Sequence, residues 1–139
     1  MKPITGSCLC GHVRYVIAGP LGPAEYCHCS MCRRAHGSAF SANAEVPAAS
    51  LQVTSGADLV AEFASSAQRR RCFCKRCGSQ LFIRRLDDPS TLAVALGTLE
   101  AGLHARPTRH VFVDSKVAWY EITDELPRFR IYPGFEPEE

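Results

Sequence analysis

The stretch Cys27-His28-Cys29-Ser30-Met31-Cys32 places three thiols within six residues, at the spacing C-x-C-x-x-C. Thiolates are ligands that soft cations prefer, and Zn²⁺ normally takes four of them. Two cysteine pairs flank this cluster, Cys8-Leu9-Cys10 near the start of the chain and Cys74-Lys75-Arg76-Cys77 past the middle. The simplest division of the eight cysteines is therefore a four-thiol site, a three-thiol site and one remaining residue, Cys72.

The two predicted sites differ in whether they leave a ligand position open. The two flanking pairs would supply all four ligands of a closed, structural site. Because these pairs are far apart in the sequence, a shared metal ion would cross-link the fold, and structural zinc contributes on the order of 10 kcal/mol to folding. The central cluster supplies three thiolates, which leaves a fourth position for water or for an incoming thiol.

Other interpretations of the central cluster remain open. A fourth protein ligand could close it: Cys72, which lies beside the second flanking pair, or His36, with His28 disfavoured because strand alternation turns it away. Cys29 and Cys32 could form a redox pair, but that motif usually begins a helix in a βαβ unit. A disulfide framework is less favoured, because such close spacings suit metal chelation better than long-range cross-links.

Short apolar or alternating segments predict a mainly β fold. Val13, Tyr15 and Ile17 alternate with more polar neighbours, which indicates a strand with one buried face. Strands are expected at residues 12–17, 25–29, 39–46, 51–54, 71–74, 81–83, 92–96 and 110–113. Residues 58–64 are a further candidate, although their alanines also allow a helix.

A short helix is expected directly after the central cluster. Ser30 is predicted to cap a turn or two of helix over residues 31–36, which Gly37 would end. Cys32 would then lie in the first turn, where exposed N–H groups favour a thiolate. In the extended piece before it, Cys27 and Cys29 are expected to point the same way, opposite to His28.

Length and charge restrict the class of protein. The chain has 139 residues, as expected for one domain spanning 1–139, and a net charge of +2, too small to indicate nucleic acid or membrane binding. No signal peptide is recognised, so a cytoplasmic protein with reduced thiols is expected. The basic residues of segment 69–76 indicate a solvated face or a patch that steers an acidic small molecule towards the cysteines.

Four segments together resemble one known family. They are Gly6-Ser7-Cys8-Leu9-Cys10-Gly11, Cys27-His28-Cys29-Ser30-Met31-Cys32-Arg33, Phe73-Cys74-Lys75-Arg76-Cys77-Gly78-Ser79 and His110-Val111-Phe112-Val113-Asp114-Ser115-Lys116. This pattern resembles the glutathione-dependent formaldehyde-activating enzyme family, which also includes centromere protein V. The resemblance covers nearly the whole chain and is more specific for fold and metals than for the reaction.

The resemblance implies compact, sandwich-like antiparallel sheets with two zinc ions. It assigns Cys8, Cys10, Cys74 and Cys77 to structural zinc, and Cys27, Cys29 and Cys32 to catalytic zinc. The implied reaction is a carbon–sulfur lyase reaction, the reversible addition of a thiol such as glutathione to formaldehyde or a related small aldehyde. Cys72 lies outside the family motif and is expected to be an inert buried thiol.

A second class of function stays open beside the enzyme. The same zinc-stabilised β domain could carry a thiol or bind a protein partner without turnover. Four residues near the central cluster, His28, Arg33, Arg34 and His36, could assist a reaction or hold substrate carboxylates, but packing and surface roles explain them equally well. They are left without a catalytic assignment, and the sequence does not indicate an oligomeric state.

Overall fold

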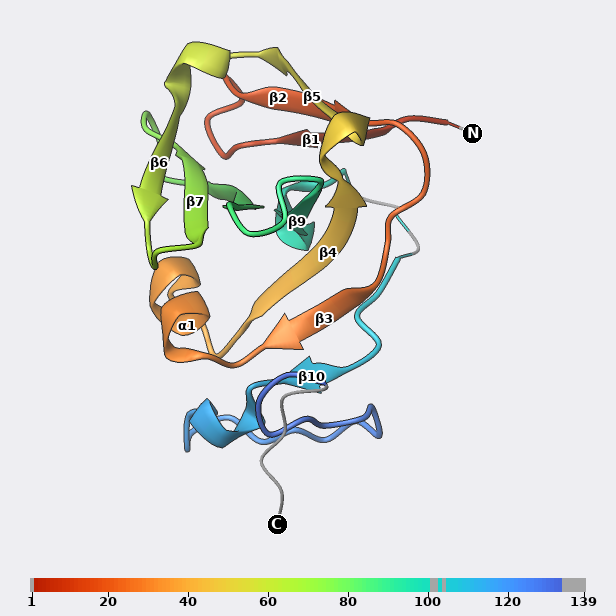
Figure 1. Ribbon diagram of the computed structural model, residues 1–139, viewed down its shortest axis with the longest axis vertical. Coiled ribbons are helices and arrows are strands. Elements are labelled where there is room, and N and C mark those ends of the chain that lie inside the picture. The colour runs from red at the N-terminus through yellow and green to blue at the C-terminus, as the bar shows by residue number, and fades with distance from the viewer. Residues whose placement is uncertain (1, 101–102, 104, 134–139) are drawn as a thin grey trace.

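The computed structural model describes residues 2–100, 103 and 105–133 and contains two β-sheets (Figure 1). The smaller sheet has the strand order β1-β2-β5, and the larger has the order β10-β3-β4-β9-β8-β7-β6. Pairing within both sheets is antiparallel, except that β10 runs parallel to β3. The mainly β class expected from the sequence is confirmed, with this one parallel pair as an addition.

The elements are short, as the turn-rich sequence predicts. The smaller sheet consists of β1 (Ile4–Ser7), β2 (Arg14–Ile17) and β5 (Leu51–Ser55). The larger sheet consists of β3 (Ala24–Cys27), β4 (Ser41–Pro47), β6 (Val60–Ala64), β7 (Arg69–Cys74), β8 (Gln80–Arg85), β9 (Thr91–Ala95) and β10 (His110–Val111). The helices are α1 (Ser30–His36) and the 3₁₀ turns η1 (Ala48–Ser50), η2 (Ala57–Leu59), η3 (Leu96–Thr98) and η4 (Val113–Ser115). Among the described residues, no helix has the length and apolar character needed to cross a membrane.

The main core lies between the two sheets. Val13, Tyr15 and Ile17 are buried, as their alternation predicts, and they pack in one cluster with Leu81 and Val94 of the larger sheet. Burying apolar side chains from both sheets in one cluster removes them from water and holds the sheets face to face. The sandwich-like arrangement therefore rests on β2 more than on any other strand of the smaller sheet.

Several predicted boundaries are corrected by the structure. Strand β3 ends at Cys27, so Cys29 lies outside the strand rather than two places along it. Strand β10 stops at Val111, because Phe112 takes a left-handed conformation (φ 57°) that a strand cannot continue through. Of the two possibilities for residues 58–64, the structure shows a strand, β6, preceded by one 3₁₀ turn.

Helix α1 carries the third of the central cysteines, Cys32. It follows β3 directly and lies next to the connection between β6 and β7 (Figure 1). Its last residue precedes Gly37, which adopts the left-handed conformation (φ 58°) and donates its N–H to the carbonyl of Arg33. The predicted helix end is thus confirmed, and the helix carries Cys32 on its buried side.

Candidate metal centre

The central cysteines converge at the junction of β3 and α1. Cys27 is the last residue of β3, Cys29 is the N-cap of α1, and Cys32 lies in its first turn. The Sγ atom of Cys29 accepts a hydrogen bond from the backbone N–H of Cys32 at 3.3 Å. The three Sγ atoms lie within 4.8 Å of one another. Ser30 is therefore not the cap that the sequence suggested; it is already helical, and a cysteine sulfur takes the capping role.

The three sulfur atoms share hydrogen bonds with each other. Bonds from the thiols of Cys27 and Cys29 hold the pKa of Cys32 well below its ordinary value, and the same sharing raises the pKa of Cys27. The guanidinium of Arg71 adds a further hydrogen bond to the sulfur of Cys32, at 3.6 Å. The cluster therefore has one buried cation, Arg71, against the sulfur of Cys32.

No fourth cysteine, histidine or carboxylate among the described residues joins this group within the same distance. Cys72 instead directs its sulfur towards the Glu62 carboxylate at 3.7 Å, and burial raises its pKa to about 12. His28 pairs with His110, its Nε2 atom 2.8 Å from the Nδ1 atom of its partner. His36 also lies outside the group. The cluster thus offers three sulfur ligands and leaves a position for a fourth.

The flanking cysteine pairs form a second group, of four sulfur atoms. The Sγ atoms of Cys8 and Cys10 are 3.5 Å apart, those of Cys10 and Cys74 are 3.9 Å apart, and Cys77 completes the set within 4.8 Å. A tetrahedron with metal–sulfur bonds of about 2.3 Å has sulfur–sulfur edges of about 3.8 Å. The donor set therefore fits a closed tetrahedral thiolate site.

Local hydrogen bonds favour the ionised form of Cys10 and Cys77, whereas burial raises the pKa of Cys74 to about 11. A hydrogen bond with Ser79 lowers the pKa of Cys77 to about 5, and a backbone hydrogen bond at His12 lowers that of Cys10 to about 7. The backbone N–H of Val13 donates to the sulfur of Cys8 at 3.3 Å. Amide donors aimed at sulfur are typical of thiolates that bind a metal ion. Because Cys8 and Cys10 lie between β1 and β2, whereas Cys74 ends β7, this group connects the two sheets.

A chain of hydrogen-bonded side chains extends from His28, which lies between Cys27 and Cys29, through His110 to Asp124. The Nε2 atom of His110 lies 2.9 Å from an Asp124 carboxylate oxygen, and its Nδ1 atom meets His28. Burial, and then the neighbouring His110, lowers the pKa of His28 to about 4. Local sequence patterns do not indicate this chain of side chains, because the chain depends on the parallel pairing of β10 with β3 and on a loop residue, Asp124.

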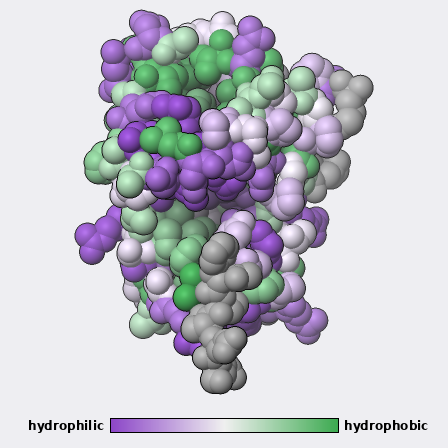
Figure 2. Space-filling view, in the orientation of Figure 1, coloured by the Kyte–Doolittle hydropathy of each residue, from purple (hydrophilic) through white to green (hydrophobic). Residues whose placement is uncertain are grey.

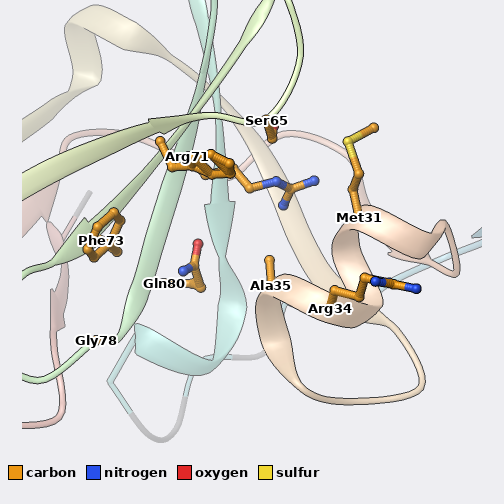
Figure 3. A pocket seen from close by; sticks show the side chains of 9 residues that line it. Met31, Arg34, Ala35, Ser65, Arg71, Phe73, Gly78 and Gln80 are labelled. Atoms are coloured by element: carbon orange, nitrogen blue, oxygen red, sulfur yellow. The ribbon is translucent and has the colours of Figure 1, made fainter.

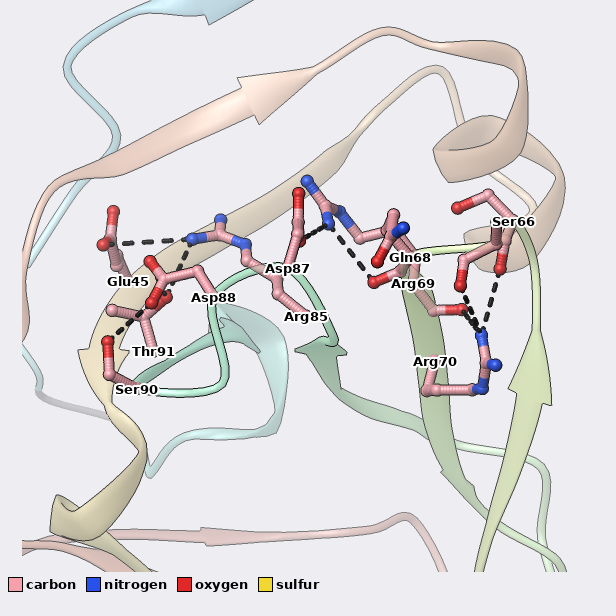
Figure 4. A network of polar contacts seen from close by, with 11 residues as sticks. Glu45, Ser66, Gln68, Arg69, Arg70, Arg85, Asp87, Asp88, Ser90 and Thr91 are labelled. Atoms are coloured by element: carbon pink, nitrogen blue, oxygen red, sulfur yellow. Dashed lines mark hydrogen bonds and ion pairs between the residues drawn. The ribbon is translucent and has the colours of Figure 1, made fainter.

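The basic segment does not have one common orientation. Arg69 pairs with Asp87 at 2.6 Å, and Arg70 donates to the carbonyl of Ser66 at 3.0 Å (Figure 4). A band of hydrophilic side chains covers the molecule over β7 and β9 in the space-filling view (Figure 2). Arg71 is different, because only 7% of its surface is exposed. The solvated-face interpretation therefore holds for Arg69 and Arg70. The burial of Arg71 against the cysteines is not indicated by any local sequence pattern.

Comparison with known proteins gives a consistent picture. The family model described as glutathione-dependent formaldehyde-activating enzyme matches residues 3–115. A Halomonas elongata protein assigned that family name is 29% identical over 143 residues, covering 97% of this chain and 90% of the relative. An Aspergillus flavus protein of the same assignment is 35% identical over 85 residues, covering 59% of this chain and 44% of the relative. The crystal structure of a Rhodobacter sphaeroides protein matches with a TM-score of 0.60 and 26% identity, covering 72% of this chain and 91% of that one.

Proposed function

This chain belongs to the glutathione-dependent formaldehyde-activating enzyme family, and we propose that it is a zinc-dependent carbon–sulfur lyase that joins a thiol such as glutathione to formaldehyde or a related small aldehyde. The observation that carries this proposal is the convergence of Cys27, Cys29 and Cys32 with no fourth protein ligand among the described residues. The names given to its relatives support the same class of reaction. A three-thiolate site with an open position is the arrangement that thiol activation requires.

In the proposed reaction, the sulfur of the substrate thiol bonds to the aldehyde carbon. The carbonyl electron pair moves to oxygen, which takes up a proton, and the product is an S-hydroxymethyl thioether. Reversal breaks the same carbon–sulfur bond and returns thiol and aldehyde. Zinc held by Cys27, Cys29 and Cys32 would supply the acidity that ionises a thiol at neutral pH.

The residues of the chain prepare the cluster for this role. The N–H of Cys32 holds the sulfur of Cys29, and Arg71 places a positive charge against the sulfur of Cys32. Three thiolates around Zn²⁺ carry a net charge of −1, and a buried guanidinium offsets that charge. We assign the second group, Cys8, Cys10, Cys74 and Cys77, to a structural zinc that joins the two sheets of one domain over residues 1–139.

The alternative proposal is a binding module without turnover. It is favoured by the burial of the cluster, since Cys27 and Cys32 are both almost inaccessible, which suits a site whose metal only stabilises the fold. Cys29 is the most accessible sulfur of the three. A substitution at Cys29 therefore distinguishes the two functions most directly.

The test compares the zinc content and activity of wild type with those of Cys29→Ser. Native mass spectrometry should find two zinc ions per chain in the wild type and one in the variant, with circular dichroism unchanged. The rate of adduct formation from glutathione and formaldehyde, followed by NMR, should fall to the uncatalysed rate. Ser30→Ala is the matched control, because it changes the neighbouring residue but no ligand. Full activity in Cys29→Ser, or an inactive wild type with two zinc ions, would overturn the catalytic proposal and favour the binding module.

A further inference from the structure

A cavity of about 560 Å³ lies beside the central cluster, between α1, β6 and β7 (Figure 3). Its apolar lining comes from Met31 and Ala35 on α1, Phe63 on β6 and Phe73 on β7. Met31 and Phe63 are unusually exposed for large apolar side chains, at 45% and 60%. Exposed apolar side chains around a concave surface are typical of a binding site rather than of a solvated face.

The polar part of this cavity is centred on Arg71. Its side chain extends from β7 towards α1, and the guanidinium lies between Ser65 and Ala35 (Figure 3). The Nη2 atom donates to the sulfur of Cys32, but Nε and Nη1 are buried without any hydrogen-bond partner. No ion pair joins Arg71 to a carboxylate in the part of the chain that the structure describes. A buried charged donor without a partner is costly, so its retention calls for a ligand.

Ser65 provides a second group of the same kind. Its Oγ atom is also buried without a partner, and it lines the same cavity. The hydroxyl and the guanidinium thus converge on one polar end, whereas Phe63, Phe73 and Met31 line most of the rest, with Gln80 as the one amide side chain among the described lining residues. Arg34 lines the same cavity from the exposed side of α1 and adds a further positive charge.

The chemistry of the two ends defines the ligand class. Guanidinium and hydroxyl donors recognise a carboxylate, and charge-assisted hydrogen bonds to it are the strongest available. Among the described residues, the lining offers the buried amides or ammonium group of a peptide only one amide partner, Gln80, so most of these groups would stay unpaired, which costs free energy on burial. An anion with a hydrophobic body fits both ends, and a polar peptide fits only one of them.

We propose that this cavity binds a carboxylate with an apolar, preferably aromatic, body, with the carboxylate at Arg71 and Ser65. Resting on the proposed function, we infer that the thiol substrate belongs to this class, because Arg71 contacts both the cavity and the sulfur of Cys32. A mercapto-acid whose thiol is on the carbon next to the carboxylate would then have both groups next to the cysteine cluster, with its apolar body in the cavity. Such a thiol should be preferred to glutathione.

The first experiment needs no catalysis. Phenylacetate and its neutral counterpart phenylacetamide are titrated into the zinc-loaded protein and followed by NMR. Phenylacetate should bind at least about tenfold more tightly, the ratio that a single charge-assisted hydrogen bond supplies. Shifts should be confined to α1, β6 and β7. Equal affinity for the two compounds, or no binding at millimolar concentration, would overturn the carboxylate site.

Variants separate a ligand site from a general charge effect. Arg71→Met should abolish the preference for phenylacetate, and Ser65→Ala should reduce it several-fold. Arg69→Met is the matched control, because it removes the same charge from the same strand at a residue that does not line the cavity. Equal losses in Arg69→Met and Arg71→Met would overturn the proposal. If Arg71→Met loses zinc, its effect on binding could come from damage to the cysteine cluster. Ser65→Ala then decides, and an unchanged preference for phenylacetate over phenylacetamide in that variant would refute the site.

The second experiment tests the substrate class. The rate of adduct formation with formaldehyde is compared for α-mercaptophenylacetate, its amide and glutathione, each corrected for the uncatalysed reaction. α-Mercaptophenylacetate should give the highest kcat/KM, and Arg71→Lys should retain more of it than Arg71→Met. A higher kcat/KM for glutathione would overturn the substrate inference. If no thiol reacts, the proposed function fails, whereas the phenylacetate titration still decides whether the carboxylate site exists.

Discussion

The Nε2 atom of His28 lies 2.8 Å from the Nδ1 atom of His110, and when both rings are neutral this contact determines which nitrogen of each ring carries the hydrogen. Ionised Asp124 can only accept a hydrogen bond, so the Nε2 atom of His110 must donate to it. The Nδ1 atom of His110 is then the acceptor for the N–H of His28. This leaves the Nδ1 atom of His28 unprotonated, buried and without a partner. His28, which lies between Cys27 and Cys29, is thereby held in one orientation by the hydrogen-bonded side chains of His110 and Asp124.

His110→Phe is expected to destabilise the protein through His28. Phenylalanine retains the ring that stacks on Tyr26, 4.9 Å between centroids, but it leaves the Nε2 donor of His28 buried and unpaired. Such a group costs about 1–3 kcal/mol. Urea unfolding of the zinc-loaded protein measures this loss. Gln52→Phe, at an exposed position of β5, is the control and should change stability by less than about 0.5 kcal/mol. Wild-type stability in His110→Phe would contradict the predicted role of the contact.

The contribution of Asp124 should depend on pH in a defined window. The hydrogen bond from His110 holds the pKa of this carboxyl below its ordinary value of 3.8. A depressed pKa in the folded state stabilises the protein above the unfolded pKa, and that stabilisation is lost as the pH falls through the folded value. The difference in melting temperature between wild type and Asp124→Asn should therefore be present at about pH 5 and should shrink as the pH falls below about 4. A difference that is as large at about pH 3 as at about pH 5 would refute the assignment.

Sequence reasoning was most successful where the determinant is local. The C-x-C and C-x-x-C spacings indicated the two sulfur groups, because cysteines so close in sequence need only one turn to meet. The alternation of Val13, Tyr15 and Ile17 likewise predicted which face of β2 is buried. The predicted cap of α1, Ser30, is one residue after the observed cap, Cys29. Serine is the commoner capping residue, and a cysteine in a metal-binding pattern is expected to act as a ligand rather than as a cap.

The missed features depend on contacts that are distant in sequence. Arg69, Arg70 and Arg71 are identical residues in one run, but only Arg71 is buried, with its guanidinium hydrogen-bonded to the sulfur of Cys32 on α1. The pairing of His28 with His110 requires a parallel contact between β3 and β10, which local periodicity does not indicate. Asp124 lies in a loop whose position follows from tertiary structure alone.

Cys72 is expected to be chemically inert in the folded protein. It is 1% exposed, and burial, then the nearby Glu62 carboxylate, raises its pKa to about 12, so almost no thiolate forms at neutral pH. Iodoacetamide should leave it unmodified until the chain unfolds, as mass spectrometry of the intact protein can show. Cys72→Ala should keep the wild-type zinc content, whereas Cys74→Ser should lose one zinc ion. Rapid alkylation of folded protein at Cys72 would show that the thiol is accessible.

Loss of the four-sulfur group should have a different consequence from loss of the three-sulfur group. Cys8 and Cys10 precede β2, and Cys74 ends β7, so a metal ion bound there would connect the two sheets. Structural zinc contributes on the order of 10 kcal/mol, which is comparable with the total stability of about 5–15 kcal/mol of a small domain. Cys10→Ser should therefore unfold most of the chain and remove the dispersion of its NMR amide signals. Cys29→Ser should keep that dispersion, because β3 and α1 remain packed by their other contacts. A Cys10→Ser protein that melts at the wild-type temperature would show that the sheets need no metal ion to hold them together.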